Sequence, residues 1–376
     1  MKILVAGDFC PKQRIADLIE KGNYEAIFGQ VKPVVAQSDF SIVNFECPVC
    51  STECNNIKKA GPSLKCSSRA VEALRFAGFD CATLANNHFY DQGEAGVKET
   101  IQALTEAGID HVGGGKNLEE AERTLYHTVS DKTIAIINCC EHEFSIATEK
   151  TGGSNPLSPI RQYYAICEAR KRADYVLVIV HGGIEHYQYP TPRMVDTYRF
   201  FIDAGADAVV NHHQHCFSGY EMYQGKPVFY GLGNYCFDWK ERHTALWEEG
   251  FMVMLDFEES DITFQLYPYS QNGKEVGVHL KDGTAFSDWK QRFDAISAVI
   301  ADKRKLKEVY DGFLVRTERR YMARLTPYSN RFLVASYLRG FLPDLFPKRK
   351  LPVLLNTLLC ESHYDRMVEM LRNKTK

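Results

Sequence analysis

Acidic, amide and imidazole side chains recur in this sequence directly after short apolar runs. Each run has the length of a β-strand, and the polar residue stands where the strand would end. In open α/β sheets, functional groups collect just beyond the carboxyl ends of the strands. We therefore expect these side chains to share one cleft. The candidate members are Asp8, Glu46, Asn87, His181, His213 and His215.

The donor types in this set favour a divalent-metal site. Carboxylate, imidazole and amide oxygen together suit manganese, iron, zinc or cobalt. Glu46 is the natural bridging carboxylate for a two-ion site. His213 and His215 are two residues apart, so in an extended segment both side chains face the same side. The sequence therefore predicts a divalent transition-metal cofactor of one or two ions.

Single members of the pattern also have simpler interpretations. Asp8 alone fits a helix N-cap equally well. His88 alone would be a hydrogen-bonded loop histidine, and His212 a mere neighbour of the ligands. Glu185 follows His181 in HGGIEHYQYP. It fits a partner that orients a ligand histidine, a general acid or base, or a surface carboxylate.

Other polar residues near strand ends carry less information. Asn44 and Asn86 are interpreted as turn residues. Glu141 and Glu143 leave another strand, where a surface position is the simpler interpretation. Asn234, in the tight turn of GLGNYCFD, is a possible site residue.

Short apolar strands alternate with amphipathic helices over the first 260 residues, which predicts a layered α/β domain. The expected strands are Ile3–Ala6, Phe40–Asn44, Cys81–Leu84, Thr133–Asn138, Tyr175–Val180, Ala208–Val210 and Val228–Tyr230. The expected helices are Ser67–Ala77, Gly93–Ala107, Leu157–Arg172 and Arg193–Ala204, with Gly78, Gly108 and Gly205 as C-terminal caps of three of them. Phe251–Phe257 and Ile262–Tyr267 should pair antiparallel through a turn at Glu258–Asp261.

The C-terminal part changes character from about Ser287, where the pattern becomes helical, basic and aromatic. We predict two domains, at residues 1–270 and 287–376. Residues 301–376 hold 17 lysines and arginines against 8 acidic residues, although the whole chain has a net charge of −3. This basic region fits an acidic partner, a membrane surface contacted peripherally, or a solvated helical face. The balanced total gives no bias toward nucleic acid.

The twelve cysteines are scattered along 376 residues, which does not indicate a disulfide framework. The first residues, MKILVAGDF, have the pattern of a strand rather than of a signal peptide. No apolar run reaches the length of a transmembrane span. We therefore expect a reduced, cytoplasmic environment.

The segments that carry the candidate residues form long motifs in a fixed order. They are GDF at Asp8, NFECPV around Glu46, LANNHFYDQGEAGVKETIQALTEAGI from Leu84, VHGGIEHY from Val180, DAGADAVVNHHQHC from Asp203 and GKPVFYGLGNYCFD from Gly225. Together, over about two-thirds of the chain, they resemble the capsule-biosynthesis CapA family, also called the poly-γ-glutamate synthesis family. That family looks like a branch of the calcineurin-like metallophosphoesterase superfamily.

The resemblance implies a four-layer αββα fold with a metal centre between loops. It implies that Glu46 takes the place of the bridging aspartate and that His88 donates to the transition state. The remaining ligand positions fall to Asp8, Asn87, His181, His213 and His215. Cys10 stands where the superfamily's Asp-x-His motif has its histidine. It either ligates as a thiolate or leaves the first metal position weak, so occupancy by one ion is an alternative.

Two functions of different classes follow from these observations. The first is a metal-dependent hydrolase in capsule or surface-polymer synthesis, which cleaves a phosphoester or amide bond with metal-activated water. His88 and Glu185 would then be its catalytic residues, and the polymer-synthesis machinery its partner. The second is a non-catalytic assembly partner of a polymer synthase that retains a degenerate metal site. Cleavage of a nucleic-acid phosphoester is a weaker third idea, because no recognition motif supports it.

Overall fold

A computed structural model describes residues 1–50, 54–258, 261–323, 326, 328, 330–343, 345, 348, 351–359, 367, 371 and 374. The chain divides into two compact units, Met1–Leu306 and Lys307–Lys376. The predicted turn at Glu258–Asp261 includes residues 259–260, which lie outside the described residues.

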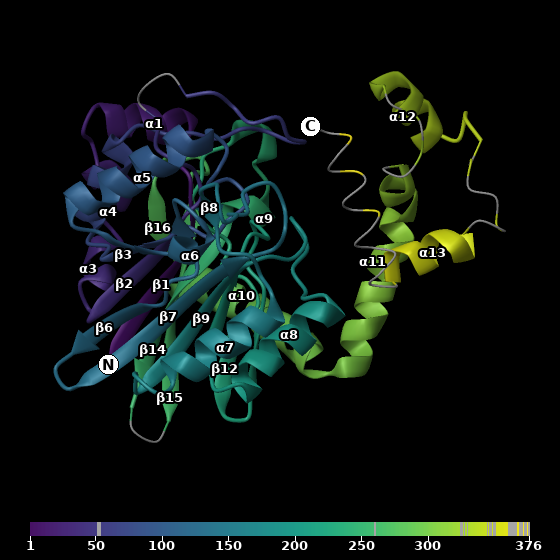
Figure 1. Cartoon of the computed structure of the whole chain (residues 1–376). Helices are drawn as coiled ribbons and strands as arrows, with labels where there is room; N and C mark the ends of the chain where they lie inside the picture. The colour runs from purple at the N-terminus through teal and green to yellow at the C-terminus, as the bar shows by residue number, and fades with distance from the viewer. Residues whose placement is uncertain are drawn as a thin grey trace. The chain divides into compact units, whose positions relative to one another are not determined.

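The first sheet holds eight strands of the described chain, in the order β16-β15-β14-β1-β2-β3-β4, with β13 beside β1 (Figure 1). Its strands are β1 (Lys2–Phe9), β2 (Phe40–Phe45), β3 (Cys81–Thr83), β4 (Asp110–Val112), β13 (Asn234–Cys236), β14 (Glu249–Phe257), β15 (Ile262–Gln271) and β16 (Val278–Leu280). β1 to β4 run parallel. β14 and β15 form the predicted antiparallel pair, which β16 extends by one further antiparallel strand. β1 is a near-continuous apolar run because both of its faces are buried.

The second sheet joins six described strands in the order β11-β12-β10-β9-β7-β6. They are β6 (Leu125–Val129), β7 (Lys132–Cys140), β9 (Tyr175–His181), β10 (Ala208–His212), β11 (Tyr220–Tyr223) and β12 (Lys226–Phe229). β7, β9, β10 and β12 are parallel, and the two edge strands are antiparallel to their neighbours. A short pair, β5 (Gly114–Gly115) with β8 (Gly153–Ser154), lies apart.

Helices cover the outer face of each sheet (Figure 1). The helices of this unit are α1 (Gln13–Glu20), α2 (Glu25–Phe28), α3 (Lys32–Val35), α4 (Arg69–Ala77), α5 (Gly93–Ala107), α6 (Leu118–Ala121), α7 (Pro159–Ala169), α8 (Pro192–Asp203), η1 (Lys240–Arg242), α9 (Ala245–Glu248) and α10 (Gly283–Ala301). α4 and α5 end at Gly78 and Gly108, whose φ angles of 94° and 67° give the expected left-handed caps.

Alternation along β1 separates two apolar cores. Ile3 and Val5 belong to a cluster that includes Val178 of the opposite sheet. Leu4 lies in a second cluster with helix residues such as Leu74 of α4. Because successive side chains of a strand point to opposite faces, β1 contributes to both cores. The result is the predicted four-layer αββα sandwich.

The first unit extends further along the chain than the predicted boundary at residue 287. Trp289 and Phe293 of α10 are fully buried, with ring centroids 5.4 Å and 5.3 Å from that of Phe251. Burial of two large aromatic side chains ties α10 to the sandwich. The division therefore falls at Leu306.

The second unit is helical in its described residues, as predicted. α11 (Lys303–Met322) leads into it, followed by α12 (Arg331–Leu338) and α13 (Leu351–Leu359). Several large apolar side chains of this unit are exposed, among them Phe332 and Phe341. None of the described helices combines the length and the apolar character that crossing a membrane requires.

Candidate metal centre

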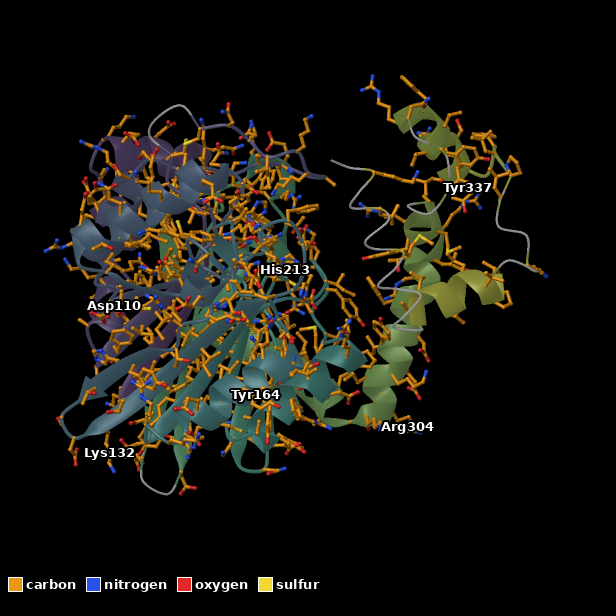
Figure 2. All side chains as sticks on the ribbon, in the orientation of Figure 1. Asp110, Lys132, Tyr164, His213, Arg304 and Tyr337 are labelled. Atoms are coloured by element: carbon orange, nitrogen blue, oxygen red, sulfur yellow. A yellow bond between two sulfur atoms is a disulfide. The ribbon has the colours of Figure 1, made fainter. Side chains whose placement is uncertain are left out.

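The predicted site residues meet where the carboxyl ends of the two sheets face each other. Asp8 ends β1, and Glu46 follows β2 beside it. His181 ends β9, and His213 follows the neighbouring β10. The sheets are linked here because the His213 backbone N–H donates to Asp8 Oδ2 at 3.3 Å. His213, labelled in Figure 2, is buried, as are the other members of the set.

Asp8 reaches the site through a close backbone approach at Gly7. A Cβ atom on Gly7 would lie 2.0 Å from the carbonyl oxygen of Gly233. The Asp8 N–H donates to that same oxygen at 3.1 Å. Glycine at position 7 therefore allows the loop after β12 to pack against the end of β1.

Three donors form a first group: Asp8, Glu46 and His215, whose ligand atoms all lie within 4.8 Å of one another. His215 Nδ1 is 3.5 Å from Asp8 Oδ2, and His215 Nε2 is 3.5 Å from Glu46 Oε1. These separations fit side chains that surround an ion.

A second group shares Glu46 and adds His181 and His213. His213 Nδ1 lies 3.0 Å from His181 Nε2, and His181 Nε2 lies 4.0 Å from Glu46 Oε1. Asn87 Oδ1 is 3.1 Å from the same His181 nitrogen. Glu46 therefore belongs to both donor groups, and its role as a bridge between two ions stays a prediction.

The buried carboxylate of Glu46 is the observation that tests whether an ion fits here. Both of its oxygens are buried and, among the described residues, have no hydrogen-bond partner. Such a carboxylate is costly unless a cation compensates it. Carboxylate and imidazole donors suit divalent transition metals. The donor set and the unpartnered oxygens thus fit one or two such ions.

The protonation of the site follows from its burial and its carboxylates. Burial raises the pKa of Glu46 well above its usual range. Burial acts against the charged form of His215, but Glu46 and Asp8 outweigh it and raise the pKa of His215 to about 9. Burial also lowers the pKa of His181 well below its usual range, helped by the neighbouring histidines. Without an ion, His215 therefore holds a proton near neutral pH.

Three further side chains orient the donors. Asn44 donates to Asp8 Oδ1 at 2.7 Å, and its Nδ2 lies 3.2 Å from His181 Nδ1. Asn234 Oδ1 is 2.9 Å from His215 Nδ1. Asn87 donates from Nδ2 to Glu143 at 2.8 Å, which leaves its oxygen toward His181. Partners of this kind fix the orientation of ligand side chains.

Two of these orienting residues correct the sequence interpretation. Asn44 is not a turn residue, because it lies inside β2. Glu143 is exposed on average, yet one of its oxygens holds the Asn87 amide. The sequence signal for Asn44 is its place two residues before Glu46, which puts both side chains on the same face of an extended strand. For Glu143 the sequence offers only its position after a strand. Asn234, a possible site residue from the sequence, does contact a donor, His215.

His88 is held by two charged side chains. Its Nδ1 lies 2.6 Å from Asp91 Oδ2 and 3.1 Å from Lys59 Nζ, and Lys59 also forms an ion pair with Asp91. Asp91 accepts a further hydrogen bond from the Leu64 backbone N–H. The carboxylate thus fixes both the His88 ring and the loop that carries Lys59.

Glu185 Oε2 lies 3.9 Å from Nε2 of His186, whose ring centroid is 6.3 Å from that of His215, and the Glu185 side chain is 40% exposed. Burial acts against its ionisation, but His215, His213 and Arg242 outweigh that effect and lower the pKa of Glu185 to about 2. The carboxylate is therefore ionised at neutral pH and is placed to interact with the centre.

His212 and Cys10 lie outside both donor groups. His212 Nε2 is 2.9 Å from the Ala6 carbonyl oxygen, so it links the two sheets. Cys10 belongs to the apolar cluster outside the first sheet, and its burial raises the pKa of the thiol well above its usual range. The group around Asp8 and His215 contains no donor from position 10, because the Cys10 sulfur does not lie with its ligand atoms.

Cys50 and Cys54 form a disulfide. This pair departs from the reduced environment expected from the sequence. The cytoplasmic location stays a prediction.

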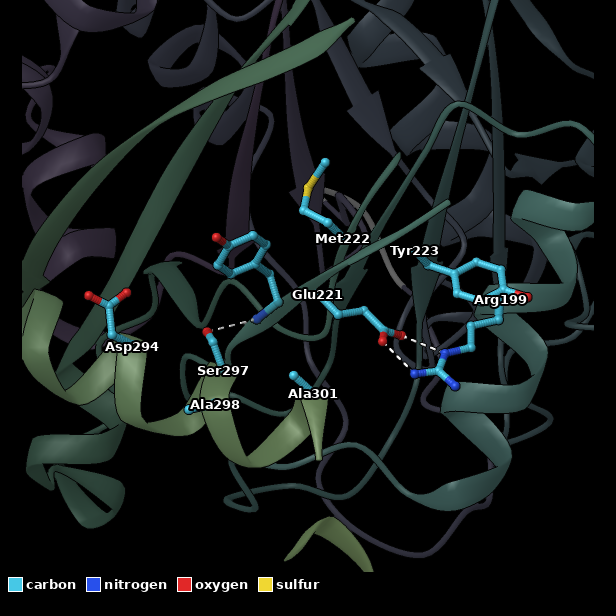
Figure 3. A pocket seen from close by; sticks show the side chains of 9 residues that line it. Arg199, Glu221, Met222, Tyr223, Asp294, Ser297, Ala298 and Ala301 are labelled. Carbon is cyan, nitrogen blue, oxygen red and sulfur yellow. Dashed lines mark hydrogen bonds and ion pairs between the residues drawn. The ribbon is translucent and has the colours of Figure 1, made fainter. Parts of the chain in front are cut away.

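The pocket in Figure 3 is separate from the metal centre. Its volume is about 580 Å³, and it lies between β11 and α10. Arg199 and Glu221 form an ion pair on its wall. None of its lining residues belongs to the predicted site. The pocket lies at the edge of the second sheet, because β11, which lines it, is the edge strand.

Comparison with known proteins now places the chain. The sequence model of the family described as bacterial capsule synthesis protein PGA_cap matches residues 2–239. The chain belongs to this family. The matched residues include both donor groups and the orienting residues, which agrees with the resemblance seen in the motifs.

Individual relatives agree with this assignment. The capsule biosynthesis protein CapA of Bacillus anthracis is 32% identical over 246 residues, which is 63% of this chain and 60% of that protein. The PGA biosynthesis protein CapA of Bacillus subtilis (strain 168) is 34% identical over 237 residues, or 62% of each chain. The match thus spans about three-fifths of the length of these relatives.

Solved structures show weaker similarity. A novel phosphatase of Mycoplasma pneumoniae aligns with 15% identity and a TM-score of 0.45, over 76% of this chain and 96% of that one. A putative 5'-nucleotidase of Staphylococcus aureus aligns with 15% identity and the same TM-score, over 78% and 58%. The family assignment therefore depends on sequence alone.

Proposed function

We propose that this member of the capsule synthesis family is a metal-dependent hydrolase that cleaves a phosphoester or amide bond during surface-polymer synthesis. The observation that carries the proposal is Glu46, which belongs to both groups of donors and whose two buried oxygens find no hydrogen-bond partner in the part of the chain that the structure describes. The relatives named as capsule and PGA biosynthesis proteins support the polymer context. The polymer is a polysaccharide or poly-γ-glutamate.

In this proposal one set of residues would bind the metal ions, and His88 and Glu185 would act on the substrate. Asp8 and His215 would hold one ion, and Asn87, His181 and His213 the other, with Glu46 between them. Bound divalent ions would activate water and neutralise charge on the substrate oxygen. His88, fixed by Asp91, would donate to the developing negative charge. Glu185 would accept or deliver a proton near the same atoms.

Elemental analysis of the natively purified protein tests the metal. We expect manganese, iron, zinc or cobalt in the wild type, and loss of it in His181→Ala. His279→Ala is the matched control, because His279 contacts a backbone carbonyl remote from the donor groups. A chelator-sensitive screen of phosphoesters and γ-glutamyl peptides then tests the reaction. Metal-free wild type, or full turnover in His181→Ala, would overturn the proposal.

Cys10 favours a second candidate, a non-catalytic assembly partner with a degenerate metal site. Its place in the apolar core leaves the Asp8 side of the centre one donor short. The second unit would provide the docking surface, because exposed Phe332 and Phe341 lie near Arg331 and Arg339 in the sequence. Apolar side chains flanked by basic ones suit peripheral contact with an anionic membrane.

Co-sedimentation with vesicles separates the two candidates. The assembly role predicts binding to vesicles that contain phosphatidylglycerol, lost when the chain ends at Leu306, with no metal-dependent turnover. The hydrolase role predicts turnover that survives this truncation. The cut is placed after Leu306 because α10 belongs to the first unit.

A further inference from the structure

A tryptophan-rich segment lies beside the metal centre. It runs from Trp239 through η1 to α9, and Trp247 in α9 is fully buried. The Trp247 ring centroid is 4.9 Å from that of His215. This segment therefore forms a wall next to one of the two donor groups.

Arg242 extends along that wall. Its guanidinium carbon lies 4.4 Å from the ring centroid of Trp239 and 5.7 Å from that of Trp247. Lys12 Nζ is 3.7 Å from the Trp239 centroid, which adds a second cation. Stacking on indole rings holds the flat guanidinium in place and leaves its N–H groups available at the edge.

Those N–H groups face the carboxylate beside the metal centre. Arg242 Nη1 is 3.0 Å from Glu185 Oε2. Glu185 Oε2 also lies 3.9 Å from Nε2 of His186, whose ring centroid is 6.3 Å from that of His215. Glu185 and His186 therefore link Arg242 to the donor group that contains His215.

This ion pair is a poor candidate for a purely structural role. The Arg242 and Glu185 side chains are 29% and 40% exposed. Ion pairs this accessible to water contribute little to the stability of a fold. An arginine fixed by aromatic rings and held by an exchangeable partner is instead suited to bind an anion, since its fork matches carboxylate and phosphate oxygens.

We propose that Arg242 binds an anionic group of the substrate, a phosphate or a carboxylate, beside the metal centre, and that this group replaces Glu185 as its partner. The site then selects substrates that carry an oxyanion close to the bond that is cleaved. Release from Arg242 leaves Glu185 free to act at the neighbouring donors. This inference deepens the proposed function and rests on it for the nature of the site.

Tryptophan fluorescence provides a direct test. The chain has three tryptophans, and replacing the buried Trp289 with phenylalanine leaves Trp239 and Trp247 as reporters at the wall. The Trp289 indole N–H has no partner among the described residues, so Trp289→Phe sacrifices no hydrogen bond. This full-length protein is titrated with inorganic phosphate and with glutarate, each with and without Mn²⁺. The two probes identify which oxyanion binds.

Substitutions at the two partners of the ion pair should change the affinity for the oxyanion in opposite directions. Arg242→Gln should weaken oxyanion binding about tenfold, because a charged hydrogen-bonded pair is lost. Arg242→Lys should recover part of it, and Glu185→Gln should strengthen it by removing the competing carboxylate. Arg292→Gln is the matched control. Arg292, in α10, also pairs with a glutamate, Glu249, and also lies over an aromatic ring, that of Phe217. It should bind as the parent does.

The outcomes separate this inference from the proposed function. Equal binding by the parent and Arg242→Gln, or no binding of either oxyanion, overturns the role of Arg242 even if Mn²⁺ is bound. Weaker binding in Glu185→Gln also overturns it, since Glu185 would then not compete. Arg242-dependent binding in a protein that takes up no metal supports this inference and contradicts the hydrolase proposal.

Discussion

The proton that His215 holds in the metal-free protein governs how the centre responds to pH. Metal binding must displace it, so affinity for the ion rises with pH while that proton is being lost. The two carboxylates next to His215 raise its pKa to about 9, so this rise should continue to that value. The raised pKa of His215 also links the stability of the metal-free protein to pH.

We predict that Mn²⁺ binds more tightly as the pH rises from 6.5 to 9, with proton release. Calorimetric titrations in buffers of different ionisation enthalpy count the protons. A pH-independent affinity without proton release would contradict the prediction.

The stability of the metal-free protein should change in the opposite direction. A folded-state pKa above the unfolded value stabilises the fold below about pH 6.5, and this contribution is lost as the pH rises through about 9. The expected loss is roughly 2–3 kcal/mol in the free energy of unfolding. Urea unfolding of chelated protein between pH 6.5 and 9 measures it. His215→Asn should flatten the dependence.

Glu143 tests the orientation of a single ligand. In Glu143→Ala the Asn87 amide loses its acceptor and can rotate its oxygen away from His181. We expect metal affinity to fall roughly 10- to 100-fold with little change in melting temperature. Glu149→Ala, an exposed acid in the same loop region, is the control. Unchanged affinity in Glu143→Ala would show that the amide is held by other means.

At the scale of elements, the loops after strands carry most of the site. His213 and His215 have φ angles of 92° and 53°, in the left-handed region that most side chains avoid. Such strain persists only where the surroundings enforce it, and it concentrates at functional sites. Here the end of β10 and the packing against Asp8 and Asn234 enforce it.

The loop at residues 54–66 depends on one buried ion pair. The Lys59 and Asp91 side chains are almost fully buried and pair with each other. Lys59→Met would leave the Asp91 carboxylate without that partner, which should lower the free energy of unfolding by about 3 kcal/mol. Chemical denaturation measures this, and the double variant Lys59→Met/Asp91→Asn should recover part of the loss. If the losses of unfolding free energy in Lys59→Met and Asp91→Asn simply added up in the double variant, the two side chains would not be coupled.

At the scale of the whole molecule, α10 decides where the chain can be shortened. A chain that ends at Leu306 should fold and bind metal, because it keeps Trp289 and Phe293 in the core. A chain that ends at Asp282 should fail to fold, since losing one such aromatic residue alone costs about 3–5 kcal/mol. Circular dichroism and metal content of both chains check this. Cooperative unfolding of the shorter chain would contradict it.

The sequence by itself predicted the long buried strands and the members of the donor set, but not the edge strands β4, β6, β11 and β16. Apolar runs fix the buried strands, and parallel strands present their carboxyl ends at one edge, so polar residues placed there must meet. That reasoning groups Asp8, Glu46, His181, His213 and His215 from the sequence alone. The pattern also predicted a layered α/β domain and the helical C-terminal region, whereas the two facing sheets were implied only by the family resemblance.

Only the tertiary structure decided which donor group each residue joins, which partners orient it, and which nearby side chains are excluded from the site. Glu46 belongs to both donor groups because the sheets face each other, a relation that no local pattern encodes. Asn44 and Glu143 touch their partners across 36 and 56 residues of sequence. Cys10 follows the last residue of β1, so strand alternation no longer fixes its direction, and it packs into the core. Contacts between distant segments depend on packing, whereas strand ends depend on the local sequence.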